Sequence, residues 1–116
     1  MARSPSPARG DVWLVSLDPT IGHEVQKTRP AVVISSNIYN RYNWVVVVMP
    51  LTSHGTAEYD QVLIAPPESG LDSASVTLPD QIRAVDRRRL VKRLGRVGPG
   101  TVAAIDRSLR IVLDLP

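Results

Sequence analysis

The segment 22–34 places a permanent cation directly before an apolar run. Arg29 precedes Pro30, and the chain continues as Ala-Val-Val-Ile. Proline fixes its own φ and disfavours helical backbone in the residue before it, so Arg29 is expected to be extended at the mouth of a strand. A guanidinium held there suits an anion such as a phosphate. On this segment alone, a solvated arginine at a strand entry remains an alternative interpretation.

Few other groups could move a proton. The two histidines are His23 and His54; Glu24 adjoins His23, and Thr52 lies two residues before His54. Side chains two residues apart share a face if the strand extends that far. A Ser-His-Asp triad could be drawn from Ser53, His54 and an aspartate, but such residues occur in any chain of this size and their spacing does not favour a triad.

Gln81 and Arg83 are separated by one residue, which in a strand would place both side chains on one face. The glutamine offers a donor and an acceptor and could read a base edge, whereas the arginine suits a phosphate or an acidic partner. An exposed strand face without a ligand explains the pair equally well. The run Arg87 to Arg89 is typical of a solvated turn.

The sequence predicts no metal site and no cofactor. It has no cysteine, its histidines lack metal-ligand spacing, and it contains no glycine-rich nucleotide loop. Nothing near the start resembles a signal peptide, and the longest apolar run, residues 44–49, is too short to cross a bilayer. These features predict a cytoplasmic protein with no membrane association.

The chain has 116 residues, a net charge of +3 and 43% hydrophobic residues, which suits one folded domain. We expect a disordered tail at 1–8 and one domain at 9–116. Of the 14 basic residues only Lys27 and Lys92 are lysines. The arginine excess fits a nucleic acid or an acidic partner, but arginine-rich codon usage explains it as well.

Short apolar runs separated by proline and glycine predict strands. They lie at 11–18, 31–35, 44–49 (ended by Pro50), 61–65, 74–78, 81–85 and 94–97, with a helical turn at 36–41 and a tight turn at 86–89. Gly98 and Pro99 begin a helix with one apolar stripe, formed by Val102, Ile105, Leu109 and Val112. The pattern predicts a mainly β fold, a small curved barrel with helical additions.

Five segments together resemble the MazF/PemK family of toxin endoribonucleases. They are residues 9–19, 22–24, 28–34, 50–53 and 80–90, in the family's order and spacing. The resemblance implies an SH3-like barrel of the MazF/PemK/CcdB type with a C-terminal helix, working as a homodimer. It also implies sequence-specific, metal-independent cleavage of single-stranded messenger RNA through 2′-hydroxyl attack, which inhibits translation and growth, and neutralisation by a small acidic antitoxin.

Carried over by position, the family's catalytic residues fall on Arg29, Thr52 and the loop carboxylate Glu24. The resemblance and the residue types place RNA contacts at His23, Gln26, Lys27, Ser53, His54, Gln81 and Arg83. Arginine is a poor base at neutral pH, so Glu24 or a histidine remains the candidate proton acceptor. The loop around residues 25–27 differs among members, so the cut sequence does not transfer.

Two other classes of protein remain open. A topoisomerase-poisoning toxin of the CcdB type acts through a terminal Trp-Gly-Ile, whereas this chain ends in Val-Leu-Asp-Leu-Pro. A noncatalytic RNA-binding barrel would bind RNA in a salt-sensitive way and release no cyclic-phosphate products.

Overall fold

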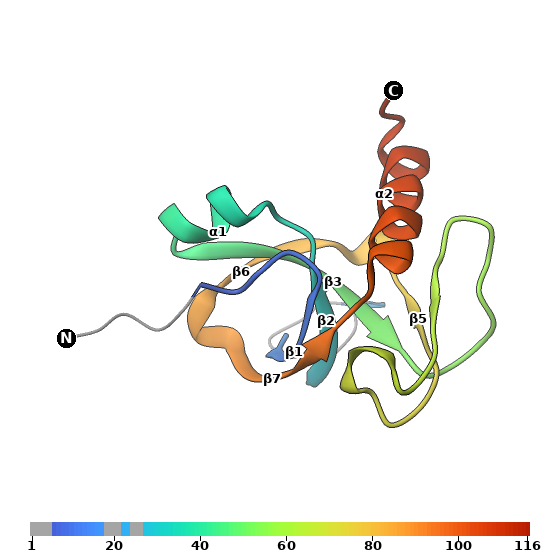
Figure 1. Cartoon of the computed structure of the whole chain (residues 1–116), viewed down its shortest axis with the longest axis horizontal. Coiled ribbons are helices and arrows are strands. Elements are labelled where there is room, and N and C mark those ends of the chain that lie inside the picture. Colours follow the sequence, from blue (N-terminus) through green and yellow to red (C-terminus); the bar gives the residue numbers. More distant parts are fainter. Residues whose placement is uncertain (1–5, 18–21, 24–26) are drawn as a thin grey trace.

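The computed structural model describes residues 6–17, 22–23 and 27–116, and within them the chain forms one strongly curled antiparallel sheet with a helix at its C-terminal end (Figure 1). The strands are β1 Asp11–Ser16, β2 Thr28–Val33, β3 Val45–Thr52, β4 Leu63–Ile64, β5 Ser75–Thr77, β6 Arg83–Asp86 and β7 Leu90–Arg96. The α-helices are α1 Asn37–Tyr42 and α2 Pro99–Leu113, and short 3-10 helices are η1 Glu68–Gly70, η2 Pro79–Gln81 and η3 Arg87–Arg89.

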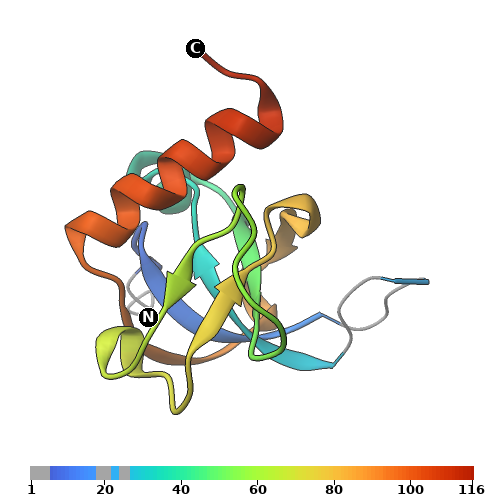
Figure 2. The same cartoon turned by 90° about the vertical axis from the view of Figure 1, so that its right-hand side faces the viewer.

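β3 lies inside the sheet and joins β4 and β5 on one side to β2, β1 and β7 on the other. The strand order is β4-β5-β3-β2-β1-β7, and β6 also pairs with β3. The sheet bends into a half-barrel, and α2 lies across one open side of it (Figure 2). The predicted mainly β fold with a C-terminal helix is therefore confirmed. Among the described helices, none is long and apolar enough to cross a membrane.

The core has two parts, one on each face of β2. Val32 packs on the α2 side, in a cluster that also holds Val12, Met49, Leu51, Ile64, Leu71, Val97 and Ile105. Ala31 and Val33 face the other way, into a cluster with Val15, Leu17, Val46, Val48 and Val85. Adjacent residues of a strand point to opposite faces, so the run of four apolar residues is buried on both, as its composition predicts.

The helix stripe is confirmed as the surface that covers the core. Ile105 is buried, and Val102 and Leu109 pack against the α2-side cluster. Gly98 is the N-cap residue and Pro99 the first helical residue, as expected. Arg9 forms an ion pair with Asp106 and so ties the start of the domain to α2.

Several predicted strand bounds were wrong, among them the start of β7 at Leu90, and two of them lie at prolines. β3 passes through Pro50 to Thr52, because Pro50 stands where β3 changes partner from β6 to β5 and its carbonyl still accepts from the Leu78 N–H at 2.9 Å. β2 begins at Thr28, so Arg29 lies within the strand and pairs with Val15 of β1.

Gln81 and Arg83 do not share a strand face, which corrects the expectation of a strand over 81–85. Pro79 opens η2, which takes in Gln81, and β6 begins only at Arg83. Proline favours the first position of a helical turn, and the Gln81 N–H donates to the Leu78 carbonyl at 3.0 Å.

The described part of the predicted N-terminal tail is hydrogen-bonded to the domain. Residues 1–5 lie outside the described residues. Within the rest, the Ala8 N–H donates to Asp11 Oδ2 at 2.8 Å and the Ala8 carbonyl accepts from the Asp11 N–H at 2.9 Å. Ala8 is therefore hydrogen-bonded to Asp11, the first residue of β1.

Candidate functional site

A pocket opens where β3 separates from β2. The two strands pair at Val33 with Val48, Val32 with Met49 and Ala31 with Pro50, and no further. The Ile34 N–H donates to the Val47 carbonyl at 2.9 Å, so the even-numbered residues of β2 direct their backbone groups towards β3. Pro30 also directs its backbone towards β3, but it has no N–H and so cannot donate the next hydrogen bond of the ladder.

Arg29 and Thr52 lie next to this separation. The last paired residues are Ala31 and Pro50, so Arg29 and Thr52 each stand two residues beyond the end of the ladder. Arg29 shares its face of β2 with Ala31 and Val33, and Thr52 shares its face of β3 with Val48, all three in the same core cluster. By this alternation both side chains are directed to the face that carries this cluster, near the place where β2 and β3 separate.

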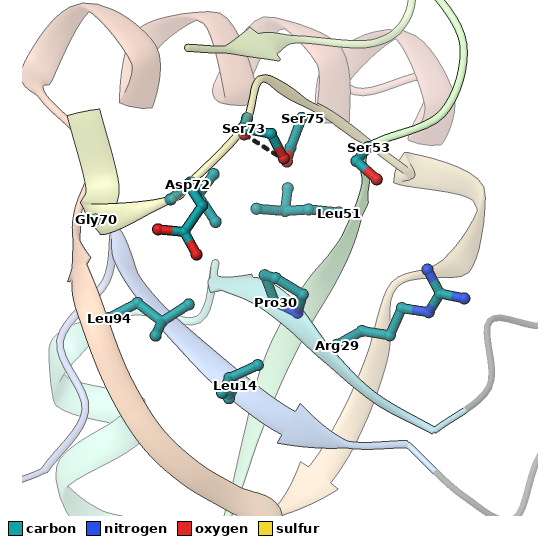
Figure 3. Close-up of a pocket in the computed structure, with 11 residues that line it drawn as sticks. Leu14, Arg29, Pro30, Leu51, Ser53, Gly70, Asp72, Ser73, Ser75 and Leu94 are labelled. Carbon is teal, nitrogen blue, oxygen red and sulfur yellow. Dashed lines mark hydrogen bonds between the residues drawn. The ribbon is translucent and has the colours of Figure 1, made fainter. Parts of the chain in front are cut away.

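The pocket has a volume of about 260 Å³ and lies beside Arg29. Its floor is apolar and its rim is polar (Figure 3). The apolar lining comes from Leu14, Pro30, Leu51, Leu71 and Leu94, and the polar lining from Arg29, Ser53, Asp72, Ser73 and Ser75. Arg29 and Ser53 are predicted site residues, so the structure brings these two together at one cavity.

The wall opposite Arg29 is built by residues 68–75, which are fastened to α2 at one end. Glu68 accepts from the Gly98 N–H at 2.6 Å and from the Thr101 hydroxyl at 2.8 Å. A carboxylate at a helix N-terminus satisfies free N–H groups and favours the helix dipole. Glu68 thus supplies the capping side chain that Gly98 lacks.

The same wall packs directly on the backbone of β7. Gly70 has φ +72°, and a Cβ there would lie 2.1 Å from the Leu94 carbonyl oxygen. A Cβ on Gly95 would lie 2.6 Å from the Ser69 carbonyl. Because both positions are glycine, the two backbones can approach this closely, and the pocket wall packs directly on β7.

The predicted residues after β3 form a turn at the pocket rim. The Thr52 hydroxyl accepts from the His54 N–H at 3.2 Å, which orients the hydroxyl oxygen. Thr52 is half-buried, whereas Ser53 and His54 are exposed. Thr52 and His54 would share a face in a continuing strand, but β3 ends at Thr52 and the chain turns there.

The loop between β1 and β2 is described at Leu17, at residues 22–23 and at Lys27. His23 and Lys27 are exposed, and the Lys27 carbonyl accepts from the Leu17 N–H at 3.0 Å, closing the loop at its base. Glu24 and Gln26, predicted for catalysis and RNA binding, lie outside the described residues.

Two arginines hold the end of β1, where this loop begins. Arg83 donates to the Leu17 carbonyl at 3.1 Å, and Arg89 donates to the Ser16 carbonyl at 3.1 Å. Arg83 was predicted to contact RNA; its guanidinium here also fixes the base of the loop. Gln81 lies in η2, away from the residues that line the pocket.

Asp86 and Arg88 form a polar contact that is separate from the pocket. Asp86 Oδ1 accepts from Arg88 Nε at 3.0 Å and from the Arg88 N–H at 2.8 Å. The side-chain bond, followed by the backbone bond, holds the pKa of Asp86 below its ordinary value of 3.8 and raises the pKa of Arg88. Asp86 also caps η3, so we interpret this pair as structural.

Sequence reasoning missed Asp72, Ser73 and Ser75 as pocket residues. The only local signal was the turn Ser69-Gly70-Leu71, which indicates a chain reversal and no chemistry. Within the described ranges, no three His, Cys, Asp or Glu side chains gather as a metal site would require.

Comparison with known proteins gives a family and several relatives. Residues 8–113 match the family described as PemK-like, MazF-like toxin of type II toxin–antitoxin system. Endoribonuclease MazF9 of Mycobacterium tuberculosis is 36% identical over 113 residues, covering 92% of this chain and 96% of the relative. Endoribonuclease PemK of Escherichia coli is 42% identical over 96 residues, covering 81% of this chain and 71% of the relative.

Solved structures agree with the sequence relatives over nearly the whole chain. MazF from Deinococcus radiodurans superposes with a TM-score of 0.81 at 26% identity, covering 94% of this chain and 97% of that one. A mycobacterial endoribonuclease in complex with its cognate antitoxin superposes with a TM-score of 0.80 at 27% identity, covering 96% and 98%. From the family match over residues 8–113 and these relatives, we conclude that the chain belongs to the PemK-like, MazF-like toxins of type II toxin–antitoxin systems.

Proposed function

We propose that this chain is the toxin of a type II toxin–antitoxin system and a sequence-specific endoribonuclease of single-stranded RNA, with messenger RNA as its cellular substrate. Two relatives, at 36% and 42% identity, carry the name endoribonuclease. The observation that supports the proposal is that Arg29 and Thr52 both lie where β3 leaves β2, two residues beyond the last paired residues. Cleavage of messenger RNA would stop translation and growth.

In the proposed reaction the ribose 2′-oxygen attacks the adjacent phosphorus and the bond from phosphorus to the 5′-oxygen breaks. The products are a 2′,3′-cyclic phosphate and a 5′-hydroxyl. The 2′-oxygen must lose a proton, the 5′-oxygen must gain one, and the crowded phosphorane must be stabilised. DNA has no 2′-hydroxyl and would not be cleaved.

Arg29 is proposed to stabilise the phosphorane, because a guanidinium keeps its charge and can bind two phosphate oxygens. Thr52 is proposed to hydrogen-bond a phosphate oxygen and hold it in line for attack. Its hydroxyl oxygen accepts from the His54 N–H, so its proton is free to be donated to such an oxygen.

The proton transfers are assigned to the loop before β2. Glu24 or His23 is proposed to accept the 2′ proton, and the exposure of His23 at the loop's edge would let it reach a bound strand. RNA contacts beyond the reacting phosphate are proposed for Gln26, Lys27, Ser53, His54, Gln81 and Arg83.

The partners follow from the same family. A mycobacterial structural relative is described in complex with its cognate antitoxin, which supports an equivalent partner here. We propose that this partner is a small acidic antitoxin, that the toxin is a homodimer, and that both act in the cytoplasm.

The test is to incubate the purified protein with a long unstructured RNA in EDTA and map the new 5′ ends. Discrete cuts with cyclic-phosphate ends are expected. Arg29→Ala is expected to lower the cleavage rate about a hundred- to a thousandfold. Arg107→Ala, which removes an exposed guanidinium on α2, is the matched control and should cleave normally.

Other outcomes identify the rival functions. Intact RNA that stays bound, with a salt-dependent affinity, would indicate a noncatalytic RNA-binding barrel. Intact RNA together with inhibition of a topoisomerase would indicate a toxin of the CcdB type. Near-normal cleavage by Arg29→Ala would show that this arginine is not the catalytic cation.

A further inference from the structure

The pocket beside Arg29 combines three features that suit one kind of ligand. Its floor is apolar, the Asp72 carboxylate stands on one side, and Arg29 lines the opposite side with its side chain extending outward, away from Asp72 (Figure 3). Its volume of about 260 Å³ lies just below the roughly 300–1,000 Å³ typical of drug-sized ligand sites. A cavity of this size suits a single flat ring system with polar edges.

We propose that this pocket binds one nucleobase of the RNA substrate, beside the scissile phosphate, and that Asp72 selects guanine there. The proposal deepens the proposed endoribonuclease activity and rests on it. Phosphate and base are linked in one nucleotide, so a phosphate on Arg29 would bring the attached base to the adjoining cavity. The leucines and Pro30 would contact the face of the base.

Guanine follows from the chemistry of a carboxylate. An ionised carboxylate only accepts hydrogen bonds, and it can accept two in parallel. The Watson–Crick edge of guanine carries two adjacent donors, N1–H and the N2 amino group. Cytosine and adenine offer one amino group next to an acceptor, and the single donor of uracil lies between two carbonyl oxygens. Unpaired bases in single-stranded RNA expose this edge for reading.

Asp72 is held in place well enough to act as a reader. It belongs to the pocket wall, residues 68–75, whose first part is fastened by the Glu68 contacts with α2 and by the close approach of Gly70 to β7. On its other side, Ser75 is buried in β5 and its hydroxyl donates to the Ser73 carbonyl at 3.2 Å. A recognition group needs such support because small displacements weaken discrimination.

A peptide side chain is the less favoured occupant. The expected antitoxin is acidic, and a carboxylate on the pocket wall would repel an acidic segment. Arg29 and Asp72 lie on opposite sides of the cavity, so a phosphate bound by Arg29 would leave the attached base on the side of Asp72 (Figure 3).

The first test maps cleavage sites in an RNA library with a randomised segment. Wild-type cuts are expected to show guanine at one position next to the scissile bond. Asp72→Asn should lose that preference by about 5- to 150-fold, the range of a bidentate base contact, while still cleaving the library. Asp114→Asn, at the exposed C-cap of α2, is the matched carboxylate-to-amide control and should cut as wild type does. An unchanged guanine preference in Asp72→Asn overturns the proposal.

The second test separates the pocket from the reaction. Guanosine 3′-monophosphate and uridine 3′-monophosphate are titrated while the backbone amide shifts of residues 70–75 are followed by NMR. The wild type is expected to bind the guanosine nucleotide more tightly by about 5- to 150-fold, and Asp72→Asn should remove the difference. Equal affinities, or shifts elsewhere only, overturn the assignment.

The outcomes also distinguish this proposal from the proposed endoribonuclease activity on which it rests. Guanosine binding that depends on Asp72, without any RNA cleavage, would retain the pocket and refute the nuclease. Cleavage with no guanine preference would retain the nuclease and refute the pocket. If Asp72→Asn weakens only the binding of the antitoxin, the cavity belongs to the protein partner and the nucleobase assignment is wrong.

Discussion

Replacing Gly70 by alanine should destabilise the protein strongly, because two costs add. The residue has φ +72°, and left-handed backbone costs a residue with a Cβ roughly 1–2 kcal/mol. The new Cβ would also lie 2.1 Å from the Leu94 carbonyl oxygen, although such contacts are essentially never below 3.0 Å. The backbone of η1 or β7 must therefore move by about 0.9 Å, the difference between the two distances.

The second cost comes from backbone movement in a packed region, which is typically about 1–3 kcal/mol. Together the two give a loss of about 2–5 kcal/mol in the free energy of unfolding. A domain has only about 5–15 kcal/mol in all, so Gly70→Ala should be clearly destabilised or unfolded. The movement would also displace Asp72 and the pocket wall.

Alanine substitutions at two further glycines separate the cost of the left-handed backbone from the cost of the close contact. Gly55 has φ +86° and nothing within 4 Å of an added Cβ, so Gly55→Ala should lose only roughly 1–2 kcal/mol. Gly100, in the first turn of α2, has neither a positive φ nor a neighbour, so Gly100→Ala should be neutral or gain up to about 1 kcal/mol. Urea denaturation measures all three. If Gly70→Ala costs no more than Gly55→Ala, the reasoning from the close approach is refuted.

Three more predictions concern the elements around the site. Arg83→Ala should slow cleavage by releasing the Leu17 carbonyl, and the RNA contact proposed for Arg83 predicts a log–log salt slope of binding smaller by about 0.7; an unchanged slope would limit Arg83 to holding the end of β1. Glu68→Ala should cost about 0.5–2 kcal/mol in urea denaturation by removing the cap of α2, with Glu58→Ala, an exposed site, as the control. A wild-type-like midpoint in Glu68→Ala would contradict that role. Because the folded-state pKa of Asp86 is lowered, its stabilisation is present above about pH 4 and is lost as the pH falls through that lowered value. Asp86→Asn should thus flatten the fall in stability below about pH 4, and urea midpoints at pH 2–6 that run parallel to wild type would disprove this.

Several elements could be predicted from local pattern because their signals are short-range. The α2 stripe repeats every three or four residues, and the β2 run buries both faces, so each was recognisable without a partner. The prolines were harder to interpret. Pro50 was expected to end β3, but whether a missing N–H breaks a ladder depends on which strand lies on that side. That information belongs to the sheet and not to the segment.

The sequence alone determined the residue types that a phosphate site needs and the strands that carry them: Arg29 before an apolar run, and Thr52 after another. Only the tertiary structure decided that both residues lie where β2 and β3 separate, since the ladder between these strands ends at Ala31 and Pro50. It also decided that Asp72 stands across a cavity from Arg29, through the hold of Glu68 on α2 and of Gly70 on β7. The physical reason is that the periodicity of a segment indicates which face of a helix or strand a side chain lies on. Contacts between residues far apart in sequence produce no such periodicity, so the sequence of one segment does not predict them.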